Sequence, residues 1–325
     1  MQLYRGIIKQ ALDVTWKSKY LWFFGLFAAL LGNGGEYEIL FRALSGNFNN
    51  DFFSGFRMIA QTGVFSWQGL RNFGNLLITQ PISVIVALLV LVIFLALFAF
   101  VIWLVNVSQA ALVNNTLLKI DNKQTSFREA LESGMKKFWP VFGFNFVSKL
   151  ITIISLAIIS FIVVMGNNLG STMSLIVYTF VILLFIPVAM SFSFIVKYSI
   201  GYSVINNVEF VNAFKSGWEL FRKNWLISLE MAFILYFLNI VIALLFIIVV
   251  LVFATPFALL AFLASGLSMT GMFLFIIGVG IIFFFAFLIV TGSLVATFQI
   301  SAWTSLFVEL IGKGAKSKLV RMFTR

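Results

Sequence analysis

The sequence predicts an all-α integral membrane protein with six transmembrane helices in three tandem units. Hydrophobic residues make up 62% of the 325 positions and charged residues only 10%, whereas soluble domains carry about 25% charged residues. Uncharged apolar stretches of about 20 residues, the length that crosses ~30 Å of hydrocarbon, recur along the chain. A basic amphipathic segment also recurs, each time shortly before an apolar stretch.

The recurring segment is clearest where Phe210 is aligned with Phe127. Both copies carry large apolar residues at helical spacing, which predicts a helix with one apolar stripe. A fainter copy at the N-terminus places Ile8, Leu12 and Trp16 on one face. We expect each copy to lie at the cytoplasmic membrane surface as a basic interfacial helix. The residues that coincide are Ala213 with Ala130, Ser216 with Ser133, Gly217 with Gly134 and Phe221 with Phe138.

These copies divide residues 1–325, interpreted as a single polytopic membrane domain, into units of about 1–113, 114–205 and 206–310. Residues 311–325 form a basic tail. The first span is short, and a cleavable signal peptide is the alternative interpretation of that stretch. The predicted spans are Tyr20–Leu31, Ile82–Val105, Leu150–Met165, Ser174–Val196, Met231–Ala254 and Met272–Val295.

Three prolines punctuate the predicted spans. Pro81 stands where a first-turn proline is tolerated, at the start of the second span. Pro187 is expected to kink the fourth span. Pro256 is expected to end the fifth, which leaves Thr255–Thr270 as an apolar hairpin at the outer interface.

The distribution of lysine and arginine predicts the orientation. With both termini in the cytoplasm, 19 of the 22 basic residues lie inside, and only Arg42, Arg57 and Arg71 lie outside. This bias follows the positive-inside rule and predicts a multi-pass membrane protein with both termini in the cytoplasm. The extracytoplasmic loop at residues 33–80 is either a membrane-hugging loop with short interfacial helices or a ligand-binding lid.

Composition argues against catalysis. The chain has no histidine and no cysteine, which removes Ser–His catalysis, histidine metal ligands and thiolate chemistry. All three aspartates lie outside the predicted spans, and no glycine-rich phosphate loop is present. We therefore expect no enzyme activity, no metal and no cofactor. The formal charge of +11 predicts attraction to anionic lipids and not to nucleic acid, because the bases flank membrane spans.

Three residues form a candidate intramembrane site: Lys149 and Glu230, near the starts of the third and fifth spans, and Asn239, midway along the fifth. Lys149 and Glu230 occupy comparable positions in two units, so they either face each other across the bundle or snorkel separately to the inner interface. Asn239 is more typical of a helix–helix hydrogen bond than of a substrate contact. A shared polar cluster is a further possibility for Asn106, Gln109 and Gln299 at the inner span ends.

Four bases at the ends of the surface helices are candidates for contact with anionic lipid. They are Lys136, Lys137, Arg222 and Lys223.

The A-x-x-S-G segments (Ala130–Gly134 and Ala213–Gly217), each followed by aromatic and basic residues and then a span, resemble a group of bacterial six-span membrane proteins. That group, mostly uncharacterised, includes the membrane domain associated with some glycerophosphoryl diester phosphodiesterases. The resemblance implies a membrane module of unassigned role. It does not carry over the phosphodiesterase activity, which resides in a separate soluble barrel of about 250 residues.

Two functions are therefore expected. The first is a non-catalytic membrane module that binds lipid, a partner protein or a second copy of itself at the inner leaflet. The alternative is a small transporter or permease subunit, which the repeated two-span units and the proline in the fourth span favour. The units run parallel and so lack the inverted symmetry typical of many transporters.

Charge reversal distinguishes the two hypotheses for Lys149 and Glu230. If they pair, Lys149→Glu and Glu230→Lys should each lower the thermal stability of the detergent-solubilised protein, and the double variant should recover it. If they snorkel separately, the double variant should show no recovery.

Overall fold

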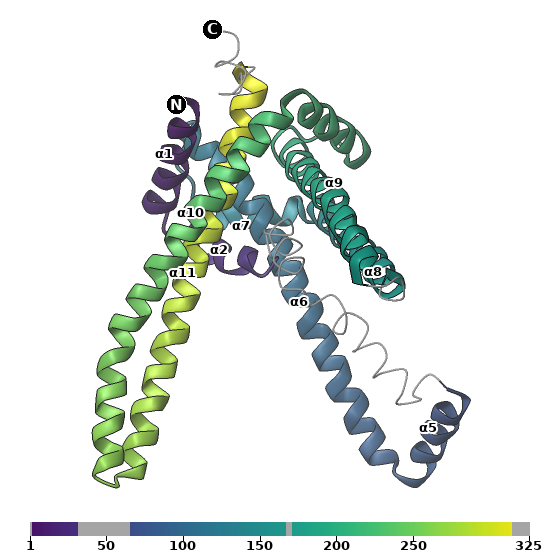
Figure 1. Ribbon diagram of the computed structural model, residues 1–325, viewed down its shortest axis with the longest axis vertical. Helices are drawn as coiled ribbons and strands as arrows, with labels where there is room; N and C mark the ends of the chain where they lie inside the picture. The colour runs from purple at the N-terminus through teal and green to yellow at the C-terminus, as the bar shows by residue number, and fades with distance from the viewer. Residues whose placement is uncertain (1, 32–65, 167–170, 314–325) are drawn as a thin grey trace. The chain divides into compact units, whose positions relative to one another are not determined.

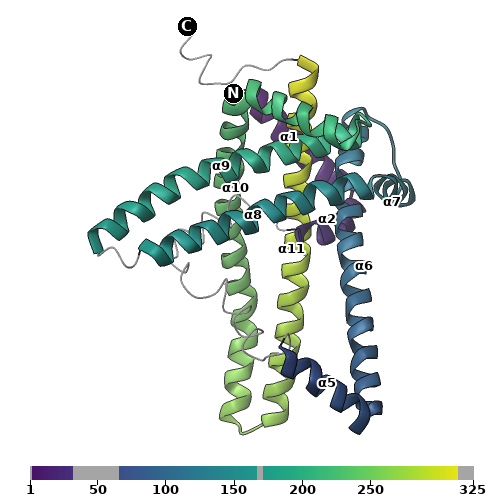
Figure 2. The same ribbon diagram turned by 90° about the vertical axis from the view of Figure 1, so that its right-hand side faces the viewer.

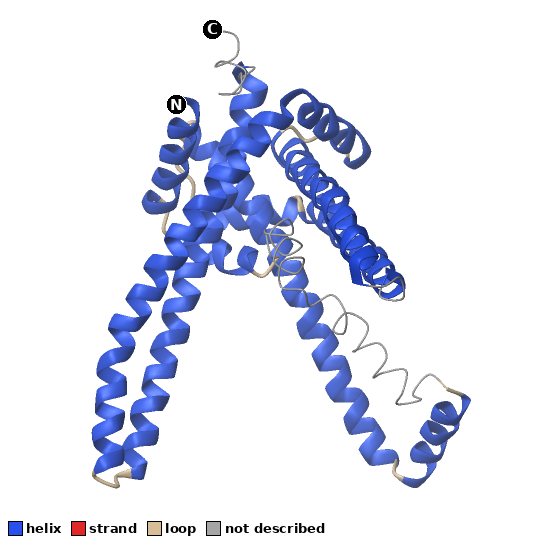
Figure 3. Ribbon diagram, in the orientation of Figure 1, coloured by secondary structure: helices blue, strands red, loops and turns tan. Residues whose placement is uncertain are grey.

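The computed structural model describes residues 2–31, 66–166 and 171–313 (Figure 1). Within these ranges every regular element is a helix and no strand occurs (Figure 3), so the all-α prediction is confirmed there. The described helices are α1 (Gln2–Lys17), α2 (Leu21–Ala29), α5 (Trp67–Thr79), α6 (Pro81–Ile120), α7 (Phe127–Lys136), α8 (Phe138–Gly166), α9 (Ser171–Ile205), α10 (Phe210–Gly266) and α11 (Thr270–Lys313).

Five of these helices contain stretches long and apolar enough to cross a membrane, as judged over the described residues. They correspond to five of the six predicted spans. The predicted first span, Tyr20–Leu31, is not confirmed. In its place stands α2, whose 9 residues rise only about 14 Å. The five stretches are Pro81–Ile120, Phe138–Ile159, Pro187–Ile205, Phe210–Gly266 and Thr270–Gly312.

The prolines behave differently from one another. Pro81 is the first residue of α6, as predicted, and Pro187 lies inside α9. The expectation that Pro256 ends the fifth span is wrong, because α10 continues through it to Gly266. Membrane helices tolerate such prolines because neighbouring groups satisfy the backbone that the ring leaves unpaired. The predicted interfacial hairpin at 255–270 is accordingly replaced by a tight turn after Gly266.

Internal contacts divide the chain into two compact units. The second unit comprises residues 34–104 and 142–196. In it, α8 and α9 run alongside each other in opposite directions (Figure 2). Every side chain of α6 from Ile85 to Val101 is exposed. Of the predicted outer loop 33–80, residues 66–80 are described and contain α5, while the rest lies outside the described residues.

The first unit comprises residues 1–33, 105–141 and 197–325. Here α11 is the central helix, because it packs against α1, α2 and α10. α10 and α11 form a long antiparallel hairpin (Figures 1 and 2). The half of α11 from Ser293 onward is largely buried, whereas the half that precedes it is largely exposed and apolar.

The crossing of α2 and α11 depends on a glycine. A Cβ added at Gly25 would lie 2.1 Å from the hydroxyl oxygen of Thr297 and 2.4 Å from the carbonyl oxygen of Ser293. The Ser293 hydroxyl donates a hydrogen bond to the Trp22 carbonyl, and the Thr297 hydroxyl lies 3.4 Å from the Leu21 carbonyl. The two backbones therefore approach as closely as small residues allow, as is common in membrane helix packing.

Replacing Gly25 by alanine should destabilise the protein, although alanine is the better helix former. The new methyl group must displace α11 backbone, and such overpacking costs about 1–3 kcal/mol. The matched control is Gly6→Ala in α1, where the added Cβ meets nothing within 4 Å. That change should leave the melting temperature in detergent unchanged or raise it, since alanine is favoured over glycine in a helix by roughly 1 kcal/mol. Equal melting temperatures for the two variants would contradict the close crossing.

Candidate functional site

The three surface helices bury the same aligned position. Ala11 in α1, Ala130 in α7 and Ala213 in α10 each have 0% exposure. Four residues later, one helical turn on, Thr15, Gly134 and Gly217 are also buried. A Cβ at Gly134 would lie 2.4 Å from the carbonyl oxygen of Val107. The small residues therefore pack against the rest of the first unit, together with larger buried residues such as Tyr4, Val14 and Leu220.

Large apolar residues next to these buried positions are exposed. Trp16, Met135 and Trp218 each follow the second buried position by one residue and are 59%, 43% and 49% exposed. Trp139 and Trp225, which come shortly after the last two, are exposed as well. Aromatic rings beside bases are typical of the membrane–water interface.

The four predicted lipid-contact bases all lie on the described part of the first unit. Lys136 forms an ion pair with Glu132 at 2.9 Å, and its hydrogen bond and charge lower the pKa of Glu132. The Lys137 ammonium donates to the Asn207 side-chain oxygen at 2.5 Å.

Arg222 and Lys223 are exposed and immediately precede Asn224, where non-helical backbone angles kink α10. The kink separates the surface portion of α10, residues 210–223, from the apolar portion that follows, residues 225–266.

The predicted intramembrane residues belong to different units of the chain. Glu230 on α10 accepts a hydrogen bond from the Tyr4 hydroxyl of α1, so this carboxylate links two helices of the first unit. Lys149 is exposed on α8 and belongs to the second unit. Their mutual pairing stays a prediction.

Asn239 bonds a neighbouring helix, as its residue type favours. Its side-chain oxygen accepts a hydrogen bond of 2.9 Å from the amide nitrogen of Gln299 on α11. The bond links α10 to α11 close to the point where the exposed half of α11 gives way to its buried half.

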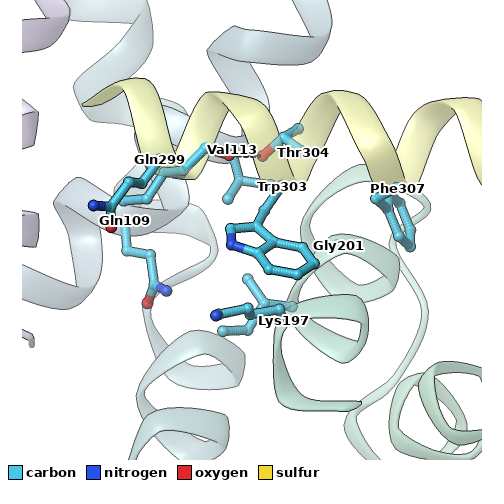
Figure 4. A pocket seen from close by; sticks show the side chains of 10 residues that line it. Gln109, Val113, Lys197, Gly201, Gln299, Trp303, Thr304 and Phe307 are labelled. Carbon is cyan, nitrogen blue, oxygen red and sulfur yellow. Dashed lines mark hydrogen bonds between the residues drawn. The ribbon is translucent and has the colours of Figure 1, made fainter. Parts of the chain in front are cut away.

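Gln299 also lines a small cavity together with Gln109, which confirms that these two members of the expected polar cluster share a site. Asn106 is buried but is not among the residues that line the cavity. Lys197 lies in the same cavity, with its ammonium nitrogen 4.5 Å from the centre of the Trp303 ring (Figure 4). The ten lining residues are Gln109, Val113, Lys197, Ile200, Gly201, Gln299, Ile300, Trp303, Thr304 and Phe307.

Sequence reasoning missed the role of Lys197, counting it only toward topology. The available signal was its setting: a lone lysine inside the helical run SFSFIVKYSIGYSV, with no acidic residue within one turn. Its neighbour Tyr198 is fully buried and shares a 2.6 Å hydrogen bond with Ser228 of α10. The helix turn that carries Lys197 is therefore fixed by packing.

No group of three or more acidic, histidine or cysteine side chains placed to hold a metal ion occurs among the described residues. Several polar groups of the first unit instead form hydrogen bonds between helices or line the cavity described above. The fold and this arrangement define an all-helical protein suited to membrane embedding. Comparison with protein-family models, curated proteins and solved structures finds no match.

A double-mutant cycle should detect the bond between Asn239 and Gln299. Asn239→Leu and Gln299→Leu should each destabilise the protein, and the double variant should lose less than the sum of the two. The expected coupling is about 0.6–2 kcal/mol, the range for hydrogen bonds between membrane helices. The stability of each variant is measured by reversible unfolding in mixed micelles. The control cycle pairs Asn239→Leu with Thr79→Val in α5, where the coupling should be near zero.

Proposed function

We propose that this chain is a non-catalytic integral membrane module of the bacterial cytoplasmic membrane that binds anionic lipid at the inner leaflet. Both termini lie in the cytoplasm in this proposal. The lipid-binding surface consists of α1, α7 and residues 210–223 of α10, and its headgroup contacts are Lys136, Lys137, Arg222 and Lys223. We call this the basic surface.

One observation carries the proposal: three helices far apart in sequence bury small residues at the same aligned position. Each therefore turns a tryptophan or methionine away from the protein, next to exposed bases. An apolar side chain beside a cation suits the boundary between acyl chains and anionic headgroups. A purely water-facing helix would have no reason to expose Trp16 and Trp218.

The same repetition supports three tandem units with six spans. In this arrangement the first span is the short stretch Tyr20–Leu31, most of which is α2. The basic helices then share one side of the membrane, in agreement with 19 of the 22 bases assigned to that side.

The alternative, a small transporter or permease subunit, is favoured by one observation. The cavity that contains Gln109, Lys197 and Gln299 brings three polar side chains together among helices that include candidate membrane spans. A transporter would need this cavity to open to both sides of the membrane in turn. Water accessibility of a cysteine placed at Gln299, tested from each side, distinguishes the alternatives: a lipid-binding module predicts labelling from one side at most.

Neutralising the basic surface should reduce lipid binding. The variant with Lys136, Lys137, Arg222 and Lys223 all changed to Gln should retain fewer phosphatidylglycerol molecules, counted by native mass spectrometry of the full-length protein released from mixed micelles. Each base near an anionic surface contributes about 1 kcal/mol, so the loss should be at least tenfold in affinity.

The matched control exchanges the four bases for each other, as Lys136→Arg, Lys137→Arg, Arg222→Lys and Lys223→Arg. Because this variant keeps every charge, it should bind phosphatidylglycerol as the original chain does. Unchanged lipid counts in the Gln variant would overturn the proposal. In that case the basic surface would be assigned to binding a protein partner or a second copy of the chain.

A further inference from the structure

A second cavity lies between the two arms of the α10–α11 hairpin, in the half nearer the turn after Gly266. Its lining comes from within residues 250–261 of α10 and 277–290 of α11, and we call it the hairpin cavity. Its volume is about 630 Å³. Ligand sites occupy about 300–1,000 Å³, and an apolar cavity of about 150 Å³ already holds a benzene molecule. The hairpin cavity is therefore large enough for a molecule with several times as many carbon atoms.

Small residues create this space between the arms. Ala254 and Ala258 on α10, and Gly280 and Ala286 on α11, line the cavity with a methyl group or no side chain at all. Ala258 and Ala286 are exposed, so the cavity is open at the side of the hairpin. Aromatic rings surround the small residues: Phe253, Phe257, Phe283, Phe284 and Phe287.

Contacts between the arms close the hairpin cavity at both of its ends. On the side of the packed core, the rings of Phe246 and Phe287 stack with their centres 5.2 Å apart and their planes at 13°. On the side of the turn, a buried cluster joins the arms: Ala261, Ala264 and Ile276, with Phe257 and Phe273 packed against it. A ligand must therefore enter sideways, from the medium that surrounds the hairpin.

The lining of the hairpin cavity offers no polar side chain. All of its residues are alanine, glycine, valine, isoleucine or phenylalanine. The cavity also lies in the middle of a long uncharged stretch, since residues 231–308 contain no aspartate, glutamate, lysine or arginine. A polar or charged ligand would lose its hydrogen bonds to water there without replacement. The matching ligand is uncharged and apolar along its whole buried length.

The dimensions of the hairpin cavity favour an extended chain. Residues 250–261 of α10 rise about 17 Å along the helix axis, and one leaflet contributes about 15 Å, half of the ~30 Å hydrocarbon core. A helix from a second copy of the chain is too wide to enter. Packed helices lie with their axes about 8–10 Å apart, and a third helix between the arms would require roughly twice that separation. Arms that touch at both ends of the cavity cannot separate so far.

We propose that the hairpin cavity binds one acyl chain of a membrane lipid. The hydrophobic effect does not favour the cavity over the surrounding lipid, because lipid tails are equally apolar. The chain is instead retained because it contacts both arms at once and gains dispersion energy on each side. The inference rests on membrane embedding but not on the basic surface, which lies at the other end of α10 and recognises headgroups.

The test counts tightly bound lipid by native mass spectrometry of the full-length protein. The protein is released from glyco-diosgenin, a steroid detergent without a flexible acyl chain. The probe is dipalmitoyl phosphatidylcholine, whose headgroup has no net charge and so does not report on the basic surface. One molecule per chain should be retained at a collision energy that removes all further lipid. Dioctanoyl phosphatidylcholine should be retained less well, because its shorter chains fill less of the cavity.

Filling the cavity from either arm should displace the retained lipid. Ala258→Phe on α10 and Ala286→Phe on α11 should each lower the affinity for dipalmitoyl phosphatidylcholine roughly tenfold, because the new ring takes the place of several methylene contacts. The matched control is Ala96→Phe, which enlarges an exposed alanine of α6 outside the cavity and should change nothing. Thermal unfolding identifies the variants that fold, and either filling variant alone suffices for the test.

The proposal is overturned if the original chain retains no phosphatidylcholine, or if a folded filling variant retains it as the original chain does. A shift from dimer to monomer in the filling variants would instead assign the site to a second copy of the chain. The variant that neutralises the basic surface should keep its phosphatidylcholine even though it loses phosphatidylglycerol. Loss of both lipids in that variant would contradict a binding site for the tail in the hairpin cavity.

Discussion

Close approach of helix backbones at small residues is the constraint on which the first unit depends. α2 can cross α11 only because Gly25 has no side chain, and the hydroxyl of Ser293 then reaches the backbone of α2. The same principle seats the surface helices, through Ala11, Ala130 and Ala213. In a membrane the hydrophobic effect does not distinguish a neighbouring helix from lipid, so contact at short range and hydrogen bonding must supply the specificity. Several of the bulky residues on the surface helices, such as Trp16 and Trp218, are exposed.

Hydropathy predicts most of the helices of this fold, because the presence of a long apolar helix depends only on the residues of that segment. The five long helices, the start of α6 at Pro81 and the helical copies at α7 and α10 all follow from local sequence. The end of α10 does not, because Pro256 breaks a helix only where the freed carbonyl has no other partner, which is a property of the surroundings. The short α2 is equally hard to predict, since its length depends on how it packs on α11.

The candidate site was predictable in part. Three amides stand out in the sequence because apolar residues surround them: Asn239, Gln109 and Gln299. In the structure Asn239 accepts a hydrogen bond from Gln299, and Gln109 and Gln299 line one cavity. Lys197 and Trp303 were not foreseen together because 106 positions separate them and no local pattern records that α9 meets α11 there. The spacing of apolar residues along a helix predicts which face is buried. It does not predict which other helix packs against that face.

α10 and α11 are longer than a bilayer is thick. Beyond the kink at Asn224, α10 still has about 42 residues, which rise roughly 63 Å, while a bilayer with its headgroups is only ~40–45 Å thick. Tilt alone cannot absorb a surplus of about 20 Å, because tilts average ~20°. The exposed apolar halves of α10 and α11 are the part of the hairpin suited to the hydrocarbon. The half that bears Glu230, Glu309 and Lys313 is suited to the headgroup region, which it shares with the basic surface.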